Sequence, residues 1–181
     1  MNEPLEVLED VVDRLRRARV PYMISGSVAM NHYAVPRMTR DLDLVVELSP
    51  EDAARFESAF GGDYYLDSGA VKRAIDHRGM FNAIHLEHVF KVDFIVRKDS
   101  EYRRLEFSRR RETEVEGVSL SIVRPEDLLL SKLDWARDSR SETQLHDIRN
   151  LIAAVPGLDW TYVRTWAGHL GLTVLMEEVT E

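Results

Sequence analysis

Two aspartates at the start of a β-rich run constrain the fold of this chain more than any other feature. Asp41 and Asp43 are separated by one apolar residue, and the run continues as Leu-Val-Val to Val46. Residues two apart in a strand face the same side, so the two carboxylates are expected side by side. Folding tolerates two like charges that close mainly when they hold a cation. The pattern therefore predicts a Mg²⁺ site at the beginning of a strand.

A small, flexible turn precedes this strand in the sequence. Gly26 and Ser27 follow residues 22–25, Tyr-Met-Ile-Ser, which predict a short buried strand. Gly26 permits a sharp turn, and Ser27 is a suitable N-cap for a short helix over residues 28–33. Backbone N–H groups at the start of a helix bind phosphate. The turn therefore predicts a triphosphate site near the paired aspartates.

A third carboxylate lies further along the chain. Asp93 interrupts the otherwise apolar run 90–96, where an unpaired charge would be costly. If this strand pairs beside the strand of Asp41 and Asp43, the three carboxylates converge. Such a cluster holds the two cations that clamp the attacking and leaving oxygens in nucleotidyl transfer. An Asp-x-Asp alone is more often a solvated strand end, but the combination favours a nucleotide site.

The order of the predicted elements indicates an α+β fold, with a mixed sheet flanked by helices and a C-terminal helical extension. The expected strands are 22–25, 42–48, 64–66, 81–86, 89–96, 112–115 and 119–123. The expected helices are 5–18, 28–33, 50–60, 68–76, 125–137, 142–154, 160–169 and 172–181. We therefore expect an α/β core over residues 1–124 and a helical region over 125–181, packed together as a single domain.

Composition and charge narrow the class of protein. The chain has no cysteine, which excludes thiolate metal sites and is typical of a cytoplasmic protein. No apolar run approaches the ~20 residues that cross a bilayer, and no secretory signal or membrane partner is expected. The net charge of −8 argues against a broad nucleic-acid surface. The basic residues 97–111 are nevertheless clustered, as either a solvated helix end or a landing surface for a phosphate-rich substrate.

With these motifs, the chain resembles the DNA polymerase β-like nucleotidyltransferase superfamily. Its signature is a Gly followed by Gly or Ser, then Asp–apolar–acidic about a dozen residues later, and a third carboxylate on a later strand. Small bacterial nucleotidyltransferases of the abortive-infection and toxin–antitoxin type are more similar still. Their motifs are matched by Arg37, Thr39, Asp41 and Asp43, and by Pro125, Asp127, Leu128, Lys132 and Asp147.

This resemblance implies a nucleotidyltransferase-like fold and a Mg²⁺-dependent enzyme. It would move an NMP from an NTP such as ATP to a hydroxyl or phosphate acceptor and release pyrophosphate. Asp41, Asp43 and Asp93 would hold two Mg²⁺ ions, and Asp93 would also accept the proton of the attacking hydroxyl. The nucleotide-binding residues that it implies are Gly26, Ser27, Arg37, Thr39, Arg40, Lys132 and Asp147.

Several alternatives stay open in the sequence. The acceptor is a tRNA end, a protein or a small molecule, and an antitoxin partner is implied only by the resemblance. The alternative function is a catalytically inactive module of the same fold that binds a nucleotide or a partner. Lys132 and Asp147 are either functional or an interhelical salt bridge. The tryptophans Trp135, Trp160 and Trp166 are expected to anchor the helical region, and no metal is assigned to His85 and His88.

Overall fold

A mixed β-sheet organises the chain in this computed structural model, which describes residues 3–39 and 41–181. Over these residues the sheet has seven strands in the order β3-β4-β5-β2-β1-β7-β6. The strands are β1 Tyr22–Ile24, β2 Asp41–Val46, β3 Tyr64–Leu66, β4 Met80–His85, β5 Phe90–Val96, β6 Arg111–Val115 and β7 Val118–Ile122.

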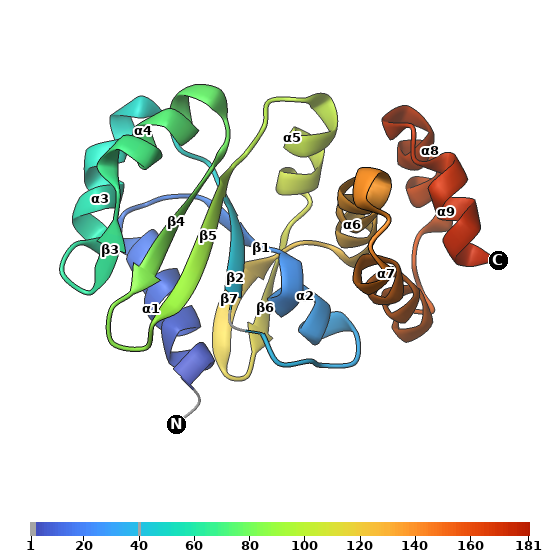
Figure 1. The fold of residues 1–181 in the computed structure, drawn as a ribbon, viewed down its shortest axis with the longest axis horizontal. Helices are drawn as coiled ribbons and strands as arrows, with labels where there is room; N and C mark the ends of the chain where they lie inside the picture. Colours follow the sequence, from blue (N-terminus) through green and yellow to red (C-terminus); the bar gives the residue numbers. More distant parts are fainter. Residues whose placement is uncertain (1–2, 40) are drawn as a thin grey trace.

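Helices connect and cover these strands (Figure 1). The helices are α1 Glu3–Arg17, α2 Gly26–Tyr33, α3 Ala53–Phe60, α4 Ser68–His77, α5 Glu101–Ser108, α6 Pro125–Ser139, α7 Glu142–Ala154, α8 Trp160–Leu170 and α9 Thr173–Thr180, and a 3₁₀ turn at Pro50–Asp52 precedes α3. Within the described residues, no helix has the length and apolarity that crossing a bilayer requires.

The centre of the sheet joins strands that lie far apart in the sequence. β2 pairs in parallel with β5 and antiparallel with β1, while β4 and β5 pair antiparallel as a hairpin. A parallel pair needs a long crossover connection, and α3, β3, α4 and β4 lie in the chain between β2 and β5. The register of this pair places Leu44 beside Phe94 and Asp43 beside Asp93.

The two faces of β2 and β5 have different environments because side chains alternate along a strand. Leu44 and Phe94 point to the buried face and are fully covered. The Phe94 ring contacts Phe56 and Phe60 of α3, with centroid distances of 5.1 Å and 5.3 Å. This aromatic packing fixes the register of the central strands, and the carboxylates therefore share the opposite face.

The C-terminal residues 125–181 form α6 to α9, which Figure 1 shows on the side of the molecule opposite α3 and α4. Both α6 and α7 contact α2, the helix that follows the Gly26 turn. Consecutive residues of α6, from Leu128 to Leu130, are buried. The predicted α+β fold with a C-terminal helical extension is confirmed.

The structure corrects two local predictions. The helix expected over residues 28–33 begins at Gly26, with Ser25 at its N-cap position, so Ser27 lies in the first turn and is no cap. Helix α5 was missed altogether, because five of its eight residues, Glu101–Ser108, are charged or serine and dilute the apolar pattern. It is held by Ser100, whose hydroxyl accepts a hydrogen bond from the backbone N–H of Arg103 at 3.3 Å.

Candidate nucleotide site

The predicted carboxylates converge on one face of the sheet. The parallel register sets Asp43 directly beside Asp93, and Asp41 beside Lys91. Asp93 is only 8% exposed, whereas the Asp41 side chain is exposed at the start of β2. The prediction of converging carboxylates required the strand of Asp93 to pair with the strand of Asp41 and Asp43. The two strands do pair.

Electrostatics in this cluster reflect the closeness of like charges. Burial raises the pKa of the Asp43 carboxyl above its ordinary value, and the charge of Asp93 raises it further. A hydrogen bond from the Ser27 backbone acts in the opposite direction. The Lys91 ammonium lies 2.8 Å from Asp93 Oδ2 and 3.8 Å from Asp41 Oδ1. A cation therefore already faces the carboxylates.

The donors of this cluster fit a divalent cation. Carboxylate oxygens are the hard ligands that Mg²⁺ prefers, and Asp43 and Asp93 present theirs from neighbouring strands. Among the residues that the structure describes, no three acidic, histidine or cysteine side chains stand arranged as a complete metal site. Lys91 contacts these carboxylates in the structure. A metal ion bound here would therefore interact with the same negative charges as the Lys91 ammonium.

The Gly26 turn is fitted against Asp43. Gly26 has φ +58°, in the left-handed region that favours glycine, and a Cβ added there would overlap the Asp43 carboxylate. The backbone N–H of Ser25 donates to the Asp43 carbonyl at 3.0 Å. The N-terminus of α2, whose first N–H groups have no partner within the helix, therefore starts in contact with the acidic cluster.

Ser27 and Thr39 fix the beginning of β2. Their hydroxyl groups form a hydrogen bond of 2.8 Å with each other, and both lie within hydrogen-bond distance of the Asp41 carbonyl, at 3.3 Å from Ser27 and 3.1 Å from Thr39. This network joins the first turn of α2 to the strand that carries the aspartates. These two residues, which were predicted to bind nucleotide, also hold the strand of Asp41 and Asp43 in position.

Two predicted cations meet at one buried carboxylate. Lys132 Nζ lies 3.0 Å and an Arg37 guanidinium nitrogen 3.3 Å from Asp147 Oδ2, and the Asp147 side chain is 6% exposed. Asn31 fixes the Arg37 backbone with hydrogen bonds of 2.8 Å and 3.0 Å. Lys132 and Asp147 do form the interhelical salt bridge. Arg40, the other predicted phosphate-binding cation, lies outside the described residues.

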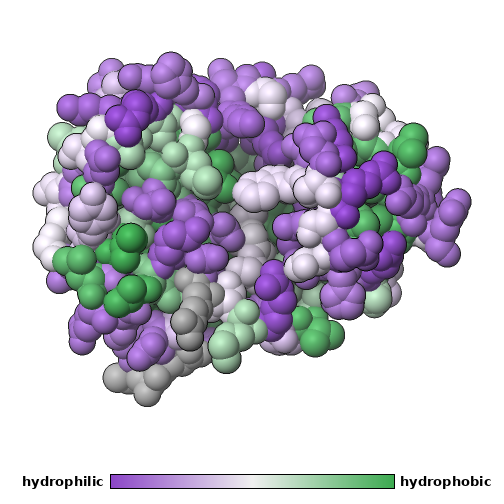
Figure 2. Space-filling model, in the orientation of Figure 1, coloured by the Kyte–Doolittle hydropathy of each residue, from purple (hydrophilic) through white to green (hydrophobic). Residues whose placement is uncertain are grey.

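These residues surround a cavity of about 320 Å³. Figure 2 shows the surface hollowed between the sheet side of the molecule and the C-terminal helices. The predicted residues that line it are Gly26, Ser27, Arg37, Thr39, Asp41, Asp43 and Lys132. Asp93 lies beside Asp43, and Asp147 lies behind Lys132. The predicted site residues that the structure describes therefore lie together at one place in the fold.

The sequence did not assign the rest of the lining to the nucleotide site. It includes Arg97, Lys98, Arg103, Glu106, Ser131, Asp134, Trp135 and Gln144. Several of these lie on α5 or on the face of α6 that α5 covers: Arg103 donates to Glu106, Ser131 and Asp134 at 2.7–2.9 Å. Without α5 in the prediction, no sequence signal connected these residues with the turn at Gly26.

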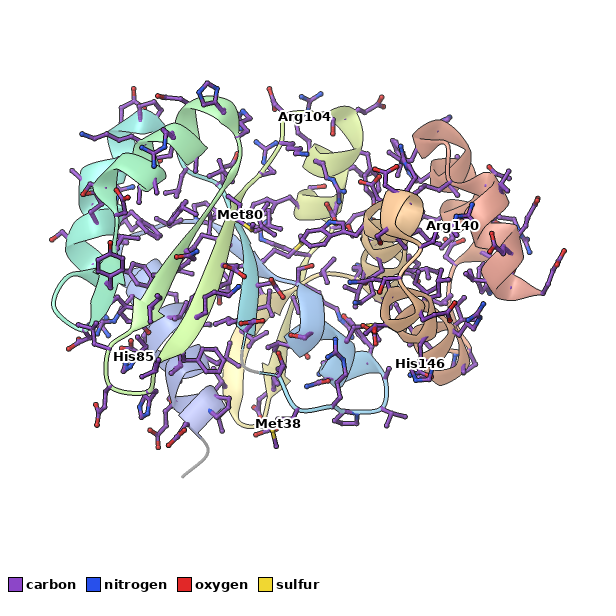
Figure 3. The ribbon with its side chains drawn as sticks, viewed as in Figure 1. Met38, Met80, His85, Arg104, Arg140 and His146 are labelled. Carbon is purple, nitrogen blue, oxygen red and sulfur yellow. The ribbon has the colours of Figure 1, made fainter. Side chains whose placement is uncertain are left out.

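Helix α5 and its flanking residues point the side chains of the basic cluster in different directions. Arg103 faces the cavity, whereas Arg104 bonds to Asp99 and lies at the outer edge of α5 in Figure 3. Arg109 pairs with the buried Asp127 at 2.9 Å. Neither a single landing surface nor a simple solvated helix end describes residues 97–111. Of the basic residues in this stretch, only Arg97, Lys98 and Arg103 line the cavity.

The aromatic predictions are correct in part. Trp166 packs on Tyr102, with ring centroids 5.2 Å apart, as expected of an anchor. For Trp135 the prediction is wrong, because this side chain is 58% exposed and lines the cavity. His85 and His88 stack at 4.7 Å at the turn between β4 and β5.

Comparison with solved structures identifies the fold. The antibiotic-resistance factor ANT(2'')-Ia matches with a TM-score of 0.61 and 16% identity, over 97% of this chain and 92% of that one. The lincosamide antibiotic adenylyltransferase LnuA, bound to lincomycin, matches at 0.52 and 14%, over 83% and 96%. An antigenic nucleotidyltransferase-like protein from Paracoccidioides brasiliensis matches at 0.54 and 19%, over 86% and 77%.

At these identities the likeness establishes the fold, and the chain has the nucleotidyltransferase fold that its motifs predicted. No protein-family model and no curated protein matches the sequence.

Replacing Gly26 with alanine should disturb the turn and the site together. Gly26→Ala places a Cβ against the Asp43 carboxylate in a left-handed backbone conformation. We expect a loss of about 2–4 kcal/mol in the free energy of unfolding, measured in urea. Gly157→Ala is the matched control, because an added Cβ there meets open space. Equal stability of the two variants would contradict the close fit of Gly26 to Asp43.

The Lys132–Asp147 pair can be separated into structural and binding roles. Asp147→Ala leaves the Lys132 charge uncompensated and should cost about 3–5 kcal/mol in unfolding free energy. The double variant Lys132→Met, Asp147→Leu removes both charges and should recover most of that stability. Calorimetric titration with Mg²⁺–ATP should still show lost affinity, since Lys132 lines the cavity. If the double variant bound Mg²⁺–ATP with full affinity, the pair would have a structural role only.

Proposed function

We propose that this protein is a Mg²⁺-dependent nucleotidyltransferase, which moves an NMP from an NTP to a hydroxyl or phosphate acceptor and releases pyrophosphate. The observation that carries the proposal is the in-register pair Asp43 and Asp93, beside a helix N-terminus that starts at Gly26. Close carboxylates and a helix N-terminus at one end of a cavity suit a metal-bound triphosphate.

Each group in the cavity has a role in this reaction. The N–H groups of the Gly26–Ser27 turn bind phosphate oxygens, and Arg37 and Lys132 neutralise the charge of the triphosphate. Divalent cations held by Asp41, Asp43 and Asp93 would stabilise the attacking and leaving oxygens. The Asp93 carboxylate accepts the proton of the attacking hydroxyl as the new phosphoester bond forms and pyrophosphate leaves.

The remaining predicted residues support the nucleotide-binding set. Thr39 holds the strand of Asp41 through its hydroxyl, and Asp147 positions Lys132 and Arg37. Arg40 belongs to the same set on the sequence motif alone. Lys91 moves from Asp93 when the carboxylates bind a cation, because both cations compete for the same oxygens.

Small molecules are favoured as the acceptor by the structural neighbours. One ANT(2'')-Ia structure is a complex with adenylyl-2''-tobramycin, with a TM-score of 0.53 to this chain, and LnuA is an adenylyltransferase bound to lincomycin. These names support ATP as the donor. The motif resemblance to toxins supports a second acceptor class, RNA or protein, together with an antitoxin partner.

A catalytically inactive binding module is the second candidate function. The 2.8 Å ion pair of Lys91 with Asp93 favours it, because the ammonium already compensates the carboxylate without a metal ion. In such a module the cavity would bind a nucleotide and leave its phosphates intact. Metal-dependent turnover distinguishes the two candidates.

The test is transfer of label from each of the four NTPs, labelled at the α-phosphate, to components of a cell extract with Mg²⁺. We expect transfer by the wild-type protein, and at least a hundredfold less by Asp43→Asn, which removes one metal-site charge. Asp138→Asn, at an exposed aspartate of α6 that does not line the cavity, is the matched control and should keep the wild-type rate.

The acceptor that carries the label decides the finer assignment. Label on RNA or protein supports the toxin type, and label on a small molecule supports an antibiotic-modifying type. Wild-type protein that binds Mg²⁺–ATP but transfers no label would contradict the enzyme and favour the binding module. Equal rates for Asp43→Asn and Asp138→Asn would also contradict the proposed site.

A further inference from the structure

Trp135 is unusual among the three tryptophans of the chain. Its indole is 58% exposed, although it lies at the edge of a cavity. Within the described residues, the indole has no ring partner, cation partner or hydrogen bond of its own. Trp160 and Trp166, by contrast, pack against the hydrophobic core. Exposure of so large an apolar ring at the edge of a cavity suggests that a ligand covers it.

The position of Trp135 on α6 relates it to the triphosphate site. Lys132 is three residues earlier and Ser131 four residues earlier, so all three share one face of the helix. All three also line the same cavity. Lys132 would contact phosphate, and Trp135 lies three residues, roughly 4.5 Å, further along the axis. In a nucleotide the ribose separates the base from the phosphates, so a base is the group expected there.

The cavity has the composition that a base needs at this distance from the phosphates. Its apolar lining comes from Val45, Ile95 and Leu128 together with Trp135. Gln144, at the start of α7, lies in the lining as well and offers an amide with both donors and an acceptor. An aromatic face with one amide nearby is how proteins bind bases, by stacking with a hydrogen bond to the edge.

We propose that Trp135 is the stacking platform for the nucleobase of the NTP, with Gln144 contacting the edge of the base. This subsite rests on the proposed nucleotidyltransferase function and specifies which end of the cavity takes the base. Stacking accepts any base because every base has a π face, so Trp135 provides affinity and Gln144 provides the preference among bases.

The test compares two ligands that share phosphates and differ in the base. The first is an ATP analogue with a methylene bridge between the α and β phosphorus atoms, which binds without transferring its NMP. The second is inorganic tripolyphosphate, and both are titrated with Mg²⁺ into the whole protein. Trp135→Ala should weaken the ATP analogue about tenfold or more and change tripolyphosphate affinity less than twofold.

Two further variants control this experiment. Trp135→Phe keeps an aromatic face and should recover most of the affinity for the ATP analogue. Tyr65→Ala removes another exposed aromatic, 61% exposed and on β3, at the far edge of the sheet, and should leave both ligands unaffected. Urea unfolding of Trp135→Ala should match the wild type, because an exposed ring contributes little to the core.

The possible results separate this subsite from the function on which it rests. Unchanged affinity of Trp135→Ala for the ATP analogue overturns the stacking role, even if the wild-type protein transfers NMP. Equal losses for both ligands also overturn it, because they would indicate a contact with phosphate. Wild-type protein that binds neither ligand overturns the subsite and the proposed function together.

Discussion

The parallel pairing of β2 with β5 is the constraint on which the rest of this structure depends. One register places Leu44 beside Phe94 in the core and Asp43 beside Asp93 on the opposite face. A slip by one residue would send the carboxylates into the aromatic packing against α3 and expose Phe94. The hydrophobic core therefore holds two like charges close together. The packing of the whole sheet offsets the unfavourable free energy of their repulsion.

Compensation of charge explains much of what surrounds this pair. Lys91 faces Asp93 within the sheet, and the Ser27 backbone donates to Asp43 from the turn. Lys132 is buried only because Asp147 lies on the next helix, and the same carboxylate holds Arg37. Cations are thus placed around the cavity by neighbouring acids, in positions that suit a triphosphate with its metal ions.

The sequence predicted the part of the site that depends on local patterns. The paired aspartates, the Gly26 turn and the embedded Asp93 each carry a recognisable signal, and the resemblance to known motifs added Arg37, Lys132 and Asp147. The α+β order was also predictable, because most strands and helices have clear periodicity. The pairing of β2 with β5 could be stated only as a condition, since no local pattern fixes which strands are neighbours.

The residues that the sequence missed depend on tertiary structure. Helix α5 is rich in charged residues, several of which are compensated by partners far along the chain, such as Arg103 with Asp134. Trp135 was assigned to the core because tryptophan is usually well buried, and only the packing of α6 against α2 and α7 shows that its ring faces the cavity. Ser27 was expected as a cap, but its hydroxyl instead joins Thr39 to Asp41.

The most direct test of the central claim is a crystal structure of the whole protein grown with Mn²⁺ and a non-transferable NTP analogue, with anomalous data collected to locate the metal. The account predicts an anomalous peak bound by both Asp43 and Asp93, with carboxylate oxygens about 2.0–2.2 Å from the ion and Lys91 moved away from Asp93. Nucleotide bound without a peak at these carboxylates, with the Lys91–Asp93 ion pair intact, would contradict it.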